Sequence, residues 1–244
     1  ESYDQAILDV EQLLGRPADI AHYYHRGQAV LFPTTGEMRR VDQTGRNRIL
    51  FLNWRPEGMT WRDVANGRID SFLARLGEHI KSTHPEPFFL SINAEFEDEI
   101  NETAGSGQTA ADFKAFFRHV VQVLRANGAG NVVTVVGYTG TPHWGDKPWW
   151  DSVYPGDDVV DWVAWDPYNW ANCSGRSRDR WRSLQQAAQP MYAHLDAVGS
   201  AKPRMLGEFG SHDDPAMGSK EQWLRDLPGT LRTAMPKLKA VVYF

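Results

Sequence analysis

Two buried, strand-like segments of the chain each carry a glutamate where the strand is expected to end. They are FFLSINAEFEDE (88–99), with Glu95, and KPRMLGEFGSHDD (202–214), with Glu208. In α/β barrels the chemistry takes place at the carboxyl ends of the strands, where the backbone opens into loops. Paired carboxyl groups from distant parts of a chain are what cleavage of a glycosidic bond requires. The two glutamates therefore predict a carbohydrate-cleaving enzyme with Glu95 and Glu208 as its catalytic residues.

The composition is that of an ordinary globular protein and argues against several kinds of partner. The 244 residues carry a net charge of −5, which disfavours nucleic acid and anionic membranes and fits a neutral substrate. The chain has no apolar run of the roughly 18 residues that a membrane span needs. The single cysteine, Cys173, excludes an intrachain disulfide.

Tryptophan is abundant, with ten residues, many of them near the ends of expected strands. An indole face matches the C–H surface of a pyranose ring, whereas protein cores use tryptophan sparingly because its N–H needs a partner. Trp54 and Trp170, at two strand ends, are the expected sugar platforms. Trp144 lies with Trp149 and Trp150 in a long loop, where we expect at least one ring to touch substrate.

Strand-like apolar runs alternate with helical patterns along the whole chain. The expected strands are 20–24, 48–54, 88–96, 131–139, 160–170, 204–210 and 240–244. The expected helices are 3–14, 66–82, 109–127, 177–198 and 218–235. Near-continuous apolar strands separated by helices indicate a parallel sheet covered on both faces.

The pattern predicts an α/β fold, a (β/α)8 TIM barrel, as a single catalytic domain over 1–244. Seven strands are visible, so we expect the first barrel strand upstream of Glu1 and the eighth cut near Phe244. Counted in this way, Glu95 closes strand four and Glu208 closes strand seven. An open doubly wound sheet is the rival, but the Gly-rich phosphate turn that usually follows its first strand is missing.

Several stretches resemble glycoside hydrolase family 26 and its actinobacterial relatives. They cover most of the chain in the order of that family: LLGRPADIAHYYHRG, FLNWRPEG, NGRIDSFLARLGEHI, FFLSINAEFED, DFKAFFRHVVQVLRANGAGNVVTVV, PGDDVVDWVAWDPYNW, KPRMLGEFGS and LKAVVYF. The resemblance implies a retaining, endo-acting hydrolase of a β-linked polysaccharide. Members cleave β-1,4-mannan, which is the first prediction, or β-1,3-xylan or mixed-linkage β-glucan.

The resemblance also assigns roles to individual residues. Glu95 takes the acid/base position, Glu208 the nucleophile position, and Tyr168 that of a tyrosine which supports the nucleophile. A raised pKa would suit Glu95, and hydrogen bonds would keep Glu208 ionised. Retention calls for carboxyl groups about 5–5.5 Å apart, whereas inversion leaves about 6.5–9.5 Å. Glu97 competes for the acid role if its strand continues that far.

Two further polar residues are candidate substrate ligands. Asp166 is in step with Tyr168 on one expected strand, so both side chains should face the same side. Asp166 could equally cap the following turn. Asn93 precedes Ala94, and on a strand these two side chains would face opposite ways.

One departure from the family pattern leaves two alternatives open. The family writes His-Glu at the acid, whereas this chain has Ala94-Glu95. The missing histidine normally helps to position substrate or nucleophile. Its absence motivates either the same chemistry on another glycan or a catalytically silent barrel that only binds polysaccharide.

We expect no metal and no cofactor, because no H-x-x-H or H-E-x-x-H spacing occurs. His22, His25 and His212 are expected to be hydrogen-bonded rim residues. The acidic pairs 157–158 and 213–214 are expected to be solvated or to cap turns. The expected partner is a polysaccharide or oligosaccharide. The protein is expected to be a secreted, extracellular monomer, a location inferred only from the substrate class and the resemblance.

Overall fold

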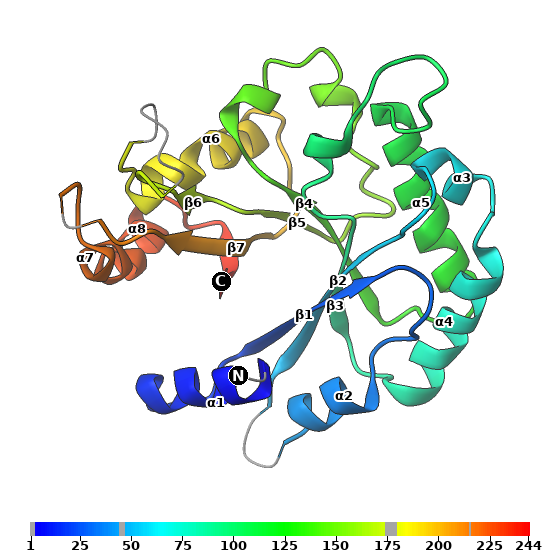
Figure 1. The fold of residues 1–244 in the computed structure, drawn as a ribbon, viewed down its shortest axis with the longest axis horizontal. Coiled ribbons are helices and arrows are strands. Elements are labelled where there is room, and N and C mark those ends of the chain that lie inside the picture. Colours follow the sequence, from blue (N-terminus) through cyan, green and yellow to red (C-terminus); the bar gives the residue numbers. More distant parts are fainter. Residues whose placement is uncertain (1–2, 44–46, 174–179, 215) are drawn as a thin grey trace. The chain divides into compact units, whose positions relative to one another are not determined.

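The structure, a computed structural model, describes residues 3–43, 47–173, 180–214 and 216–244. Parallel strands alternate with helices along the chain (Figure 1). The chain divides into two compact units, the first made of 1–94, 100–135 and 152–160, and the second of 95–99, 136–151 and 161–244. The expectation of a single catalytic domain stays a prediction.

The first unit is built on four parallel strands in the order β1-β2-β3-β4. Their bounds are β1 (Ile20–Arg26), β2 (Ile49–Arg55), β3 (Phe88–Ile92) and β4 (Val132–Tyr138), whose second half belongs to the other unit. All five residues of β3 are buried, as expected for a strand covered on both faces.

Five helices accompany these strands: α1 (Tyr3–Leu14), α2 (Thr35–Val41), α3 (Trp61–Ala65), α4 (Asp70–Thr83) and α5 (Ala110–Ala126). Helices α4 and α5 lie side by side (Figure 1). A Cβ atom added at Gly77 of α4 would lie 2.8 Å from the Cβ of Asn127, so only glycine permits this close approach. Three phenylalanines of α5, Phe113, Phe116 and Phe117, are fully buried.

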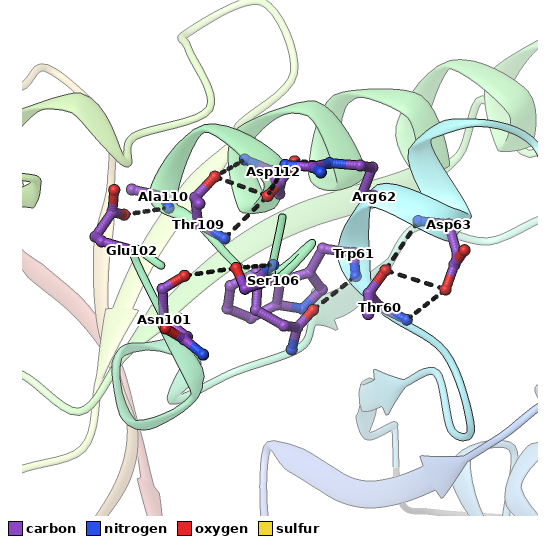
Figure 2. A network of polar contacts seen from close by, with 11 residues as sticks. Thr60, Trp61, Arg62, Asp63, Asn101, Glu102, Ser106, Thr109, Ala110 and Asp112 are labelled. Atoms are coloured by element: carbon purple, nitrogen blue, oxygen red, sulfur yellow. Dashed lines mark hydrogen bonds and ion pairs between the residues drawn. The ribbon is translucent and has the colours of Figure 1, made fainter. Parts of the chain in front are cut away.

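A network of caps fixes where α3 and α5 begin (Figure 2). Each helix starts at a threonine whose side chain accepts a backbone N–H three residues on, in a reciprocal capping box: Thr60 with Asp63, and Thr109 with Asp112. Arg62 of α3 then donates to both carboxylate oxygens of Asp112, at 2.9 and 3.1 Å. The two helix starts are therefore tied to each other by a charge-assisted pair.

The second unit contains the rest of β4 followed by the order β5-β7-β6, with β8 paired to β7, all parallel. The bounds are β5 (Trp162–Trp165), β6 (Tyr168–Asn169), β7 (Arg204–Ser211) and β8 (Leu238–Tyr243). The helices are α6 (Leu184–Ala197), α7 (Lys220–Arg225) and α8 (Leu227–Thr233), with 3₁₀ turns η1 (Phe96–Glu99), η2 (Pro142–Trp144) and η3 (Trp150–Ser152).

Strands β5 and β6 are two pieces of one expected strand. Both pair with β7, with Trp165 opposite Leu206 and Tyr168 opposite Gly210, so one extra residue of β7 lies between the pairs. The interruption falls at Asp166-Pro167, because proline has no N–H to give to a ladder. The seven expected strands are therefore all present, the fifth of them divided. A barrel strand upstream of Glu1 and a cut eighth strand stay predictions.

Several expected boundaries were wrong. The strand predicted at 88–96 ends at Ile92, since Asn93 and Glu95 have positive φ angles of 51° and 57° that a strand cannot contain. The helix predicted at 218–235 is divided into α7 and α8. The helix predicted at 177–198 starts at Leu184, and its first three positions lie outside the described residues. Helices α2 and α3 were not predicted, although both begin with a capping box.

No helix in the described part of the chain is long and apolar enough to cross a membrane.

A buried ion pair holds α1 close to the amino end of β2 and supplies a test of the first unit. Arg48 donates to both carboxylate oxygens of Glu11 at 2.6 and 2.7 Å, and both side chains are almost completely buried. We expect Glu11→Ala to lower the free energy of unfolding by about 3 kcal/mol, because it leaves a buried guanidinium without its carboxylate.

The matched control is Asp19→Ala, which removes the exposed partner of Arg16. It should cost less than about 1 kcal/mol, as exposed ion pairs do. Urea unfolding followed by circular dichroism compares the two variants. Equal losses would contradict a structural role for the buried pair.

Candidate active site

Glu95 lies on a turn, three residues after the end of β3. Its φ of 57° places it in the left-handed region, which costs a non-glycine residue of order 1–3 kcal/mol and is concentrated at functional sites. The Glu95 N–H donates to the carbonyl of Gly137 on β4 at 3.0 Å. The residue as a whole is exposed, while its carboxyl group is partly enclosed by the protein.

Glu208 lies inside β7, which continues to Ser211 rather than ending at the glutamate as expected. The Tyr168 hydroxyl donates to Oε2 of Glu208 at 2.7 Å. Burial, and then this hydrogen bond, raise the pKa of Tyr168 above its usual range, so the phenol stays a donor. The same hydrogen bond fixes the position of the Glu208 carboxyl group beside the phenol.

Asp166 fixes the backbone of Glu208. At the break between β5 and β6 its Oδ1 accepts the Glu208 N–H at 2.8 Å, in place of a strand carbonyl. Gly207 makes room for this contact, since a Cβ there would lie 2.8 Å from the same oxygen. Asp166 is buried, so the expected role as a direct substrate ligand is not supported. It acts instead on the strand that carries Glu208.

The charges of the site act on one another. Burial, then the charges of Glu208 and Asp98, raise the pKa of Glu95 to about 6. The full burial of Asp166, together with Glu208, Glu95 and Glu97, raises the pKa of Asp166 well above its usual range. Burial and neighbouring charges thus favour the protonated form of Glu95, while Glu208 accepts a hydrogen bond from the Tyr168 phenol. A carboxyl group that holds its proton more strongly than usual is suited to general acid chemistry.

Glu97 does not compete for the acid role. It lies on η1 rather than on a strand and is fully buried. Its carboxylate accepts the backbone N–H of Thr139 at 2.9 and 3.1 Å and the hydroxyl of the same residue at 3.1 Å. Burial raises its pKa to about 7, against the opposing effect of these hydrogen bonds.

Trp170 is the one expected sugar platform with a widely open ring. It is 58% exposed, and its ring centroid lies 4.9 Å from that of Tyr168, the partner of Glu208. An exposed indole beside the tyrosine that contacts Glu208 can stack on a sugar ring. Its contact with substrate stays a prediction.

Trp144 belongs to an aromatic cluster in the loop after β4. Its ring lies 4.2 Å from that of His143 and 5.8 Å from that of Trp149, and Lys147 lies over it at 5.8 Å. Trp150 is buried against Tyr138. Half-buried Trp144 and Trp149 keep some surface for a ligand.

Two expected ligands are placed differently from the predictions. Trp54 is 1% exposed, with its Nε1 donating to the carbonyl of Gly27 and its ring stacked on Phe72 of α4, so it cannot serve as an open platform. Asn93 is buried on the turn after β3, where its Oδ1 accepts from Nε1 of Trp61. Neither the residue type nor its position at a strand end tells whether the rest of the protein covers the side chain.

The histidines and acidic pairs have ordinary structural partners. His22 is buried against Phe51, and His25 contacts Glu37 at 2.8 Å. Asp158 pairs with Arg118, and Asp213 accepts the backbone N–H of Lys220. Among the described residues, no group of three or more metal-binding side chains gathers at one place.

Gly207 and Thr139 have parts in the site that the sequence reading missed. The signal for Gly207 was its place directly before the strand glutamate, in LGEFG. Thr139 gave no signal, because its contact with Glu97 depends on how the turn after β3 bends.

Curated proteins and solved structures are similar to this chain in sequence and in fold. No model of a known protein family matches the chain. Endoglucanase H of Acetivibrio thermocellus is 28% identical over 244 residues, 99% of this chain and 26% of that protein. Beta-1,3-xylanase TXYA of a Vibrio species is 29% identical over 173 residues, 66% of this chain and 33% of that protein.

Among solved structures, a ruminal GH26 endo-β-1,4-mannanase matches 100% of this chain and 56% of its own, with a TM-score of 0.67 and 14% identity. The chain has the fold of the family 26 glycoside hydrolases. This confirms the predicted (β/α)8 barrel and the resemblance at the level of fold. The actinobacterial affinity stays a prediction. The chain spans about a quarter of Endoglucanase H and a third of the xylanase.

The electrostatics of the pair can be tested directly. Carboxyl ¹³C NMR of glutamate-labelled protein should show Glu95 titrating near pH 6. Glu208→Gln removes a negative charge that raises this pKa, so the midpoint should move to lower pH. An unchanged midpoint in Glu208→Gln would mean that the two carboxyl groups do not interact.

Proposed function

We propose that this chain is the catalytic part of a retaining, endo-acting hydrolase of a β-linked polysaccharide. One observation carries the proposal: Glu95, with a raised pKa, is electrostatically coupled to Glu208, which accepts a hydrogen bond from Tyr168. A protonated carboxyl group and a stabilised carboxylate are the two groups that glycosidic cleavage uses.

In the proposed mechanism, Glu95 protonates the oxygen of the glycosidic bond as Glu208 attacks the anomeric carbon. The bond to the leaving sugar breaks, and a covalent glycosyl-enzyme ester forms at Glu208. Glu95, now ionised, takes a proton from water, which attacks the anomeric carbon and releases Glu208. Tyr168 holds the carboxylate before attack and after release.

The relatives support a β-glycan but divide over which one. The solved neighbour is named a β-1,4-mannanase, and the two curated relatives are named an endoglucanase and a β-1,3-xylanase. Mannan remains the first candidate. A β-glucan is the alternative supported by the relative that matches 99% of the chain. We also propose an extracellular monomer, since a polymer is degraded outside the cell.

Reducing-sugar release from mannan, β-1,3-xylan and mixed-linkage β-glucan tests the proposal and ranks its substrates. Endo action predicts a rapid fall in polymer viscosity with little early release of mono- or disaccharide. A protein that binds one of these polymers but releases no sugar would support the silent barrel that Ala94 suggests.

Azide rescue tests the roles of the two glutamates. Glu208→Ala should lose at least about 10³-fold in kcat, and azide should restore cleavage of an activated β-glycoside with an α-glycosyl azide as product. Glu95→Ala should instead give the β-glycosyl azide, because azide then attacks the glycosyl-enzyme. The reverse pattern of products would exchange the two roles.

The pH profile follows from the pKa of Glu95. The acid must carry its proton, so kcat/KM on polysaccharide should fall as the pH rises through about 6. Asp98→Asn removes a charge that raises this pKa, which should move the basic limb to lower pH. A basic limb that stays in place in Asp98→Asn would contradict the assignment of Glu95 as the acid.

A further inference from the structure

The turn that carries Glu95 contacts the end of β4 residue by residue. The Glu95 N–H donates to the carbonyl of Gly137 at 3.0 Å. The next residue, Phe96, packs its ring edge-on against Tyr138 at a centroid distance of 5.0 Å. The regular ladder between β3 and β4 ends earlier, at Ser91 opposite Val135. These contacts therefore replace strand pairing where the turn begins.

The third contact in this series is made by a side chain. Glu97 accepts the Thr139 N–H with both carboxylate oxygens and the Thr139 hydroxyl with one of them. Its side chain is fully buried, so water does not compete for these bonds. A buried carboxyl group that receives several donors holds them firmly.

The position of Glu95 depends on such contacts more than the position of a residue within a strand does. Its φ of 57° is sparsely populated for a residue with a Cβ, and surrounding structure must hold it there. Only one residue, Phe96, separates Glu95 from the Glu97 anchor. A shift of about 1 Å in a group that transfers a proton can cost about 10²-fold in rate.

We propose that Glu97 is a positioning residue for the acid/base Glu95, tying the catalytic turn to Thr139 at the base of the loop that carries Trp144. This inference rests on the proposed function. It requires no contact between Glu97 and substrate. Loss of Glu97 should therefore impair proton delivery by Glu95 and leave the attack by Glu208 largely intact.

The leaving group of the substrate provides the test. A dinitrophenolate departs without a proton, whereas a sugar needs one from Glu95. The value of kcat/KM covers only steps up to formation of the glycosyl-enzyme, so the later use of Glu95 as a base does not enter. In Glu97→Gln, kcat/KM on the polysaccharide should fall at least about tenfold, and on the 2,4-dinitrophenyl β-glycoside less than about twofold.

Two further variants separate this role from general damage. Glu99→Gln removes a carboxyl group from the same turn. It should leave kcat/KM on both substrates within about twofold of the values of the unmutated protein. Thr139→Val removes only the hydroxyl donor. It should lower kcat/KM less than Glu97→Gln does, and again more on the polysaccharide than on the dinitrophenyl glycoside. Thr139→Val also serves if Glu97→Gln fails to fold. Equal losses on both substrates, or none, would overturn the inference.

Hydrogen exchange provides a readout that needs no activity. Glu97→Gln should speed amide exchange in 95–99 and in 139–141, whereas Glu99→Gln should not. If the unmutated protein cleaves no glycan, the proposed function fails, and the exchange result alone decides whether Glu97 holds the turn. Unchanged exchange in Glu97→Gln would overturn that as well.

Discussion

The hydrogen bond from the Glu208 N–H to the Asp166 carboxyl group is the constraint on which the rest of the site depends. It forms because Pro167 interrupts the strand beside β7 and so leaves a backbone donor to be satisfied by a side chain. Gly207 has no side chain to obstruct the bond. The same interruption places Tyr168 one residue beyond Pro167, where its hydroxyl reaches Glu208. Backbone and side chain of the candidate nucleophile are thus fixed by one irregularity in the sheet.

The carboxyl groups of this site also affect one another's pKa values. The charges of Glu208, Glu95 and Glu97 act on Asp166, and that of Glu208 acts on Glu95. Glu95, Glu97 and Asp166 all have raised pKa values. Burial dominates each of those three shifts. Burial thus favours the protonated forms of these three carboxyl groups, and the Tyr168 phenol that donates to Glu208 keeps its proton as well. The proposed acid and the proposed nucleophile are therefore the same residue type in different surroundings.

The sequence predicted what regular patterns encode and missed what depends on breaks in them. Apolar runs that alternate with helical patterns located all seven strands. The contact between Tyr168 and Glu208 followed from the resemblance. Trp54 was misplaced because periodicity does not tell which face of β2 the helices cover. The placement of Glu97 could not be inferred, since the two positive φ angles that end β3 belong to residues other than glycine.

The left-handed backbone at Glu95 also has an evolutionary and engineering consequence. Only glycine adopts this conformation without cost. Glu95 therefore lowers the stability of the fold at this position while supplying a carboxyl group that glycine lacks. Selection for thermal tolerance alone, without selection for turnover, would tend to replace the glutamate by glycine and yield a sturdier, inert barrel. A glutamate at so unfavourable a backbone position supports the proposed catalytic role of Glu95.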